Sequence, residues 1–113
     1  MRFLIFYKPD HSAPPPPEYM KEMEGRVDEA MKSGGMLATG GLVPGCMRVR
    51  QKDAKILITD GPYAEAKEMV AGFALFELPS MEAAVESSTN FLRFAGDGEC
   101  EIRQIMEGSR FAP

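Results

Sequence analysis

The strand-forming segments of this chain are apolar on both faces, and this feature constrains the fold more than any other. Residues 3–7 read Phe-Leu-Ile-Phe-Tyr, and residues 73–76 read Phe-Ala-Leu-Phe. Successive side chains of a strand point to opposite faces of its sheet. A sheet with one face in water instead alternates apolar and polar residues. Both faces of this sheet therefore need a cover.

The other segments predict two helices and four further strands. An apolar period of three to four residues over 18–31 predicts an amphipathic helix, which Gly34-Gly35 ends. Ser80 is a natural N-cap for a second helix, which reaches Leu92. Strands are predicted at 36–42, 46–51, 55–59 and 101–106, and the longest strand at 70–78. The pair 46–51 and 55–59 forms a hairpin around Lys52-Asp53-Ala54.

This order predicts an α+β fold, a ferredoxin-like βαββαβ antiparallel sheet with an inserted β-hairpin and both helices on one face. The 113 residues fit a single domain, 1–113. A proline-rich loop at 9–17 holds four consecutive prolines. We interpret it as a stiff surface connection whose last proline opens the first helix, with a recognition role as the alternative.

Two helices can cover only one face of such a sheet, so large apolar side chains remain on the other. Burying three or four of them stabilises a protein by several kcal/mol at about 25 cal/mol per Å². We therefore expect a homodimer in which two copies pair through this face. Cover by the chain's own hairpin is the rival explanation, and we expect that hairpin to be too small and too polar.

Composition excludes several classes of function. The formal net charge is −4, and Arg48, Arg50 and Lys52 alternate along one solvated strand face, so we expect neither nucleic acid nor an anionic membrane as partner. Cys46 and Cys100 stand far apart, which predicts free thiols in a reducing cytoplasm. His11 is the only histidine, so we expect no metal site, and no motif indicates a cofactor.

One segment carries a family resemblance. Residues 59–68 read Thr-Asp-Gly-Pro-Tyr-Ala-Glu-Ala-Lys-Glu and lead into Val-Ala-Gly-Phe at 70–73. They closely resemble the DGPF signature of the YCII-related protein family, with Tyr63 in place of Phe and Ala66 in place of Thr. The resemblance covers nearly the whole chain and implies a dimeric α+β barrel. Some relatives are regarded as enzymes with a catalytic His–Asp pair, and one dehalogenates a chlorinated aromatic. DGPF-type genes often lie beside sigma factors, which implies signalling or regulation.

The signature also contains the candidate site residues. Asp60 can act as a general acid or base, and Tyr63 can donate a hydrogen bond to a developing oxyanion. Lys67 can hold an anionic substrate, Glu65 adds a carboxylate, and His11 is a further candidate for substrate binding. The structural alternatives are an Asp60 that caps a turn, a packed Tyr63, a solvated Glu65 and Lys67, and an exposed loop histidine.

Three functions stay open at this point. The first is a small-molecule enzyme with isomerase- or lyase-like activity that uses Asp60. The second is a non-catalytic protein that binds a small molecule in the same cleft. The third is a regulatory partner of a sigma factor. A catalytic Asp60 should lie in a concave, partly buried pocket beside a second polar group.

Overall fold

The computed structural model describes residues 1–11, 15–61 and 69–108. Its elements, in chain order, are β1 (Arg2–Pro9), α1 (Pro17–Lys32), β2 (Met36–Gly41), β3 (Cys46–Lys52), β4 (Lys55–Gly61), β5 (Gly72–Glu77), α2 (Met81–Ala95) and β6 (Gly98–Gln104). A four-stranded antiparallel sheet, the main sheet, has the order β2-β5-β1-β6, and β3 pairs with β4 in a separate two-stranded sheet. The ferredoxin-like α+β fold with an inserted hairpin is confirmed.

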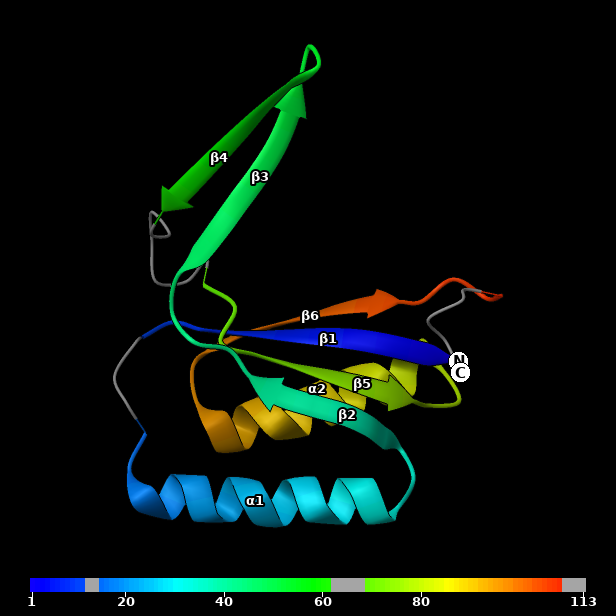
Figure 1. Cartoon of the computed structure of the whole chain (residues 1–113). Coiled ribbons are helices and arrows are strands. Elements are labelled where there is room, and N and C mark those ends of the chain that lie inside the picture. Colours follow the sequence, from blue (N-terminus) through cyan, green and yellow to red (C-terminus); the bar gives the residue numbers. More distant parts are fainter. Residues whose placement is uncertain (12–14, 62–68, 109–113) are drawn as a thin grey trace.

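The two helices lie on one side of the main sheet, and the β3–β4 hairpin rises on the other side (Figure 1). Side chains of β1 divide between these sides as the sequence predicts. Phe3 and Ile5 are buried in the core with Ala84 of α2. Leu4 and Phe6 point to the opposite side, beside Leu75 and Phe73 of β5. We call that side, with Leu4, Phe6, Phe73 and Leu75, the open face, because no described element covers it.

Helix α1 is less buried than its periodicity predicts. Met20 and Met31, which belong to the apolar period of this helix, are 53% and 40% exposed. The helix packs against β2, which is an edge strand, so only a narrow stripe of it meets the sheet. Its first turn is held instead by Tyr19, whose ring stacks on Phe94 of α2 with centroids 4.7 Å apart.

Local turn and cap chemistry follows the sequence closely. The Ser80 hydroxyl accepts a hydrogen bond from the Ala83 N–H at 3.1 Å, and Pro17 occupies the first turn of α1. Asp53 and Ala54 have φ of 52° and 62°, so they form a two-residue turn of the kind that matches the twist of a hairpin. The pairing of β2 with β5 shifts register between Met36 and Ala38, as at a β-bulge.

Strand limits differ more from expectation than strand identity. The strand expected at 70–78 spans only Gly72–Glu77, and the eight-residue β1 is longer. The last strand, expected at 101–106, runs from Gly98 to Gln104. Its pairing with β1 extends from Pro9↔Gly98 to Phe3↔Gln104. The first and last residues of a strand depend on the neighbouring strand to which it is hydrogen-bonded. The apolar pattern of a strand does not show where that neighbouring strand begins.

The described residues contain no helix that is long and apolar enough to cross a membrane. Cys46 and Cys100 are both free thiols.

Candidate functional site

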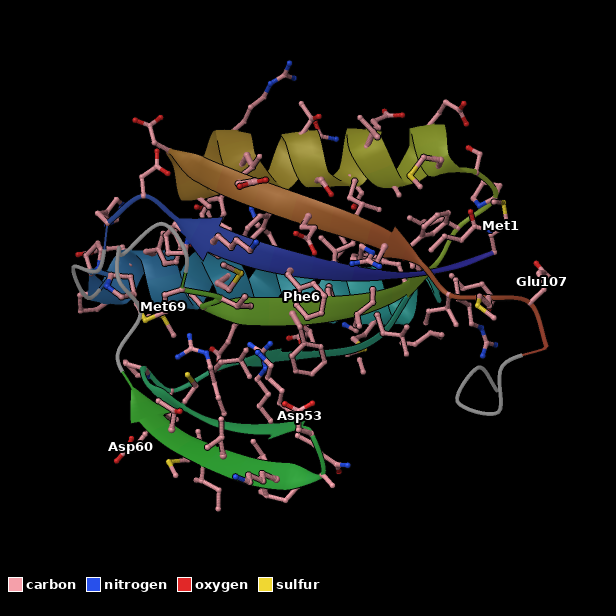
Figure 2. All side chains as sticks on the ribbon, turned by 90° about the horizontal axis from the view of Figure 1, so that it is seen from above. Met1, Phe6, Asp53, Asp60, Met69 and Glu107 are labelled. Carbon is pink, nitrogen blue, oxygen red and sulfur yellow. The ribbon has the colours of Figure 1, made fainter. Side chains whose placement is uncertain are left out.

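Asp60 lies inside β4, directly opposite Met47 of β3. It is exposed, and its carboxylate makes no hydrogen bond or ion pair within the described part of the chain. Figure 2 shows the side chain projecting from the outer side of the hairpin, away from the main sheet. In a single chain, therefore, Asp60 lacks the partial burial expected of a general base.

The hairpin has two chemically different faces. In the β3–β4 register, Asp60 shares a face with four apolar side chains that are between 56% and 68% exposed: Met47, Val49, Ile56 and Ile58. We call these four residues the apolar hairpin face. The opposite face carries Arg48, Arg50, Lys52 and Lys55 together with Leu57 and Thr59, and we call it the cationic hairpin face. Gln51, opposite Ile56, is the remaining residue of the apolar side.

The orientation of the hairpin follows from the direction of Asp60. The Asp60 side chain projects away from the main sheet (Figure 2), and it shares its face with the apolar hairpin face. The apolar hairpin face therefore turns outward, and the cationic hairpin face turns toward the body of its own chain. At the base of the hairpin, the Cys46 thiol donates to the Gly61 carbonyl at 3.5 Å.

Of the other candidate residues, the structure describes only His11. Tyr63, Glu65 and Lys67 lie outside the described residues, as does the turn that Asp60 would cap. His11 is exposed just after β1 and makes no hydrogen bond or ion pair in the described part of the chain. Two shallow surface depressions in the described part lie along α1 at Glu18, Lys21 and Glu22 and beside Asp97 at the end of α2, and Asp60 lines neither.

The open face combines an apolar centre with a charged rim. Phe6 lies opposite Phe73 and Leu4 opposite Leu75, which places four large apolar side chains together. Gly40 of β2 leaves room for one of the rings, since a Cβ there would lie 3.0 Å from Phe73 Cε1.

Ion pairs form the rim of this face. Arg2 Nη2 lies 3.4 Å from Glu77 Oε2, and Lys8 Nζ lies 3.2 Å from Glu101 Oε1. Arg103 Nη1 also approaches Glu101, at 3.8 Å from Oε2. An apolar centre inside a polar rim is the usual anatomy of a protein interface.

A second cluster of titratable groups lies on the helix side of the main sheet, and sequence reasoning missed it. Tyr7 of β1 lies opposite Cys100 of β6, and its ring meets Phe91 of α2 edge-on at 5.0 Å. Burial raises the pKa of Tyr7, and Tyr19, Cys100 and Asp10 raise it further. The phenol is therefore protonated at neutral pH and available as a hydrogen-bond donor.

Cys100 is similarly shielded from water. Burial raises the pKa of its thiol, the Ser88 hydroxyl opposes that rise, and Glu99 adds to it. The Ser88 hydroxyl is itself buried, with no hydrogen bond of ordinary geometry in the described part of the chain. Only the β1–β6 register brings Tyr7 and Cys100 together, so no local sequence pattern could have indicated the cluster.

Comparison with known proteins gives a family for the chain. The family model of the YCII-related domain matches residues 1–109, which include every described helix and strand. No curated protein matches the sequence. Among solved structures, 5-chloro-2-hydroxyhydroquinone dehydrochlorinase from Burkholderia phenoliruptrix AC1100, in complex with 2,5-dihydroxybenzoquinone, aligns over 96% of this chain and 96% of its own, with 15% identity and a TM-score of 0.49.

Proposed function

The chain belongs to the YCII-related domain family, and we propose that it binds a small molecule and catalyses a proton transfer with Asp60 as acid or base. One observation carries the proposal: the Asp60 carboxylate stands beside apolar side chains, between Met47 across the pair and Ile58 two residues earlier. A carboxylate enclosed among apolar groups loses hydration and becomes a stronger base. Removal of a proton from carbon, the step that isomerases and lyases share, uses such a base.

We further propose that the working form is a homodimer, because Asp60 is exposed in a single chain and must be enclosed by something else. The accessible surface of the chain is 8315 Å². A compact monomer of 12.5 kDa would expose roughly 6200 Å². The excess is larger than the ~800 Å² that one subunit contributes to a standard interface. The uncovered open face supports the same conclusion.

The remaining residues of the signature complete the proposed site. Tyr63 would donate a hydrogen bond to the oxyanion that forms as the proton leaves, and Lys67 and Glu65 would contact the substrate. His11, which lies outside the signature just after β1, would contact the substrate as well. We place this activity in the cytoplasm, which the free thiols of Cys46 and Cys100 support.

Ligand binding is tested by thermal-shift screening of a metabolite library against three proteins: wild type, Asp60→Asn and Asp53→Asn. Asp53 is the matched control, because it loses the same charge on the same hairpin and asparagine tolerates its positive φ. A ligand of the site should raise the Tm of wild type and Asp53→Asn more than that of Asp60→Asn. If no compound raises the Tm of wild type, the protein does not bind molecules of this class.

Catalysis is tested with any compound that passes the screen. Incubation in deuterated water should exchange a carbon-bound hydrogen of the ligand, as followed by mass spectrometry. We expect Asp60→Asn to slow this exchange by about a hundredfold or more, the usual contribution of a general base. Equal exchange in both proteins would leave a binding protein without an Asp60-dependent reaction.

Regulation through a protein partner, such as a sigma factor, is the second candidate function. The exposed apolar hairpin face favours it, since patches of this kind often mark protein interaction sites. Affinity capture with the product of a neighbouring sigma-factor gene tests it. A stable complex that Ile58→Lys abolishes would support this role over catalysis.

A further inference from the structure

The apolar hairpin face is the least protected apolar surface in the described part of the chain that belongs to a regular element. Strands β3 and β4 pair with each other, and in the described residues neither joins the main sheet. A lone two-stranded hairpin is at best marginally stable in water, and three strands or packing against another layer are needed. A stable β3–β4 hairpin therefore requires a second layer that packs over one of its faces.

The body of the same chain cannot supply that layer. The apolar hairpin face turns outward, as the direction of Asp60 on the same face indicates (Figure 2). The hairpin also extends the molecule to 46 Å along its longest axis, and the radius of gyration is 15.9 Å, against about 13 Å for a compact domain of this length. The hairpin is therefore an arm that leaves its own domain.

We propose that the arm of one copy lays its apolar hairpin face on the open face of a second copy, and that the second copy does the same in return. Each chain then contributes one arm and one acceptor face. Reciprocal contacts related by a twofold axis close into a dimer and leave neither surface in water. The hairpin rises on the open-face side of the sheet (Figure 1).

The two surfaces fit in spacing as well as in chemistry. The open face presents two rows, Leu4 with Phe6 and Leu75 with Phe73. The hairpin presents Met47 with Val49 and Ile58 with Ile56. Residues two apart on a strand are spaced by about 7 Å in every row. Side chains of equal spacing can interdigitate between sheets packed about 10 Å apart.

This contact has a consequence for the site. Asp60 shares the face with the four apolar residues, so the partner's main sheet would enclose its carboxylate. The site is then built from two chains, with the acid or base delivered by the arm. The catalytic role of Asp60 rests on the proposed function, whereas the contact between the arm and the second copy does not.

The first experiment measures molar mass in solution by light scattering for wild type, Ile58→Lys and Leu57→Lys. Ile58 and Leu57 are neighbours in β4 and are 66% and 55% exposed, but they lie on opposite faces. We expect wild type and Leu57→Lys to be dimers. Ile58→Lys should weaken the dimer by about tenfold or more, as removal of a central apolar contact does. Circular dichroism should show the same folded content in all three.

The second experiment asks which surface the arm meets. Ile58→Cys chains are mixed with Phe6→Cys chains and treated with a bismaleimide that spans the ~10 Å between packed sheets. The native cysteines stay in place, and Leu57→Cys mixed with Phe6→Cys is the control for them. We expect a cross-linked heterodimer from the Ile58→Cys mixture and at most a trace from the control. Cross-links between two Ile58→Cys arms instead would overturn the inference.

The outcomes separate this inference from the proposed function. If Phe6→Glu breaks the dimer but Ile58→Lys does not, the homodimer stands and the arm contact is wrong. A wild-type chain that is monomeric at every concentration contradicts both. If the dimer and the Ile58–Phe6 cross-link form but no ligand binds, the arm contact stands and the proposed function fails.

Discussion

Gly98 begins β6, where it pairs with Pro9 of β1. A Cβ on Gly98 would lie 2.8 Å from the Lys8 carbonyl oxygen and 3.0 Å from Pro9 Cα, which are backbone atoms that cannot swing aside. We therefore expect Gly98→Ala to lower the free energy of unfolding by about 1–3 kcal/mol, the usual cost of overpacking. Urea unfolding monitored by circular dichroism measures it.

Gly25 supplies the matched control. It lies within α1, and a Cβ there would meet nothing within 4 Å. Gly25→Ala should stabilise the protein by about 0.5–1 kcal/mol, because alanine loses less backbone freedom in a helix. The same substitution, glycine to alanine, should therefore lower the free energy of unfolding at Gly98 and raise it at Gly25. Equal effects would mean that β1 and β6 do not approach as closely as the structure places them.

Tyr7 gives a prediction about pH. Burial raises its pKa in the folded chain above the ordinary value near 10 that it has when unfolded. The unfolded chain therefore releases this proton first, and its contribution to stability is complete below about pH 10 and falls as pH rises through the folded pKa. Urea unfolding between about pH 8 and pH 11 should show this decline, and Tyr7→Phe should make it smaller. Identical slopes in the two proteins would contradict the shift.

At the scale of elements, the N-cap of α2 is the clearest test. Ser80→Ala removes the hydroxyl that accepts the Ala83 N–H and should cost about 1 kcal/mol. Thr89→Ala is the control, because Thr89 is exposed in the same helix and only donates to the Val85 carbonyl at 2.8 Å. That change should be neutral or slightly stabilising, since alanine is the better helix former. Thermal unfolding of both variants distinguishes a cap from a general loss of hydroxyl groups.

The elements that the sequence predicts well are those defined by local chemistry. Ser80 and Pro17 mark helix starts, and Asp53-Ala54 marks a hairpin turn, because capping and positive φ depend on a few consecutive residues. The packing of α1 was harder to predict. Met20 and Met31 follow a helical period, but their burial depends on an edge strand that the period does not encode.

The candidate site also depends on contacts between distant residues, which a local sequence pattern does not predict. Sequence reasoning places Asp60 at the end of a strand beside a cleft, but its neighbours come from the β3–β4 register and its direction from how the hairpin leaves the main sheet. Neither is a local property. Tyr7 and Cys100 are nearly a chain length apart, so their meeting was equally hidden. Alternation did predict correctly that Leu4 and Phe6 lie on the opposite face of the sheet from Phe3 and Ile5.

At the scale of the whole molecule, assembly and folding should be coupled. The described core holds only three buried apolar residues, Phe3, Ile5 and Ala84, while the chain exposes far more surface than a compact monomer. If the dimer supplies the missing burial, unfolding also separates the chains, and each tenfold rise in protein concentration adds about 1.4 kcal/mol to stability.

The Tm of wild type should therefore rise by several degrees over a hundredfold range of protein concentration in differential scanning fluorimetry. Ile58→Lys should have a lower Tm that depends less on concentration, and Leu57→Lys should behave as wild type. A wild-type Tm that is constant over this range would mean that the single chain is stable with its open face and apolar hairpin face in water.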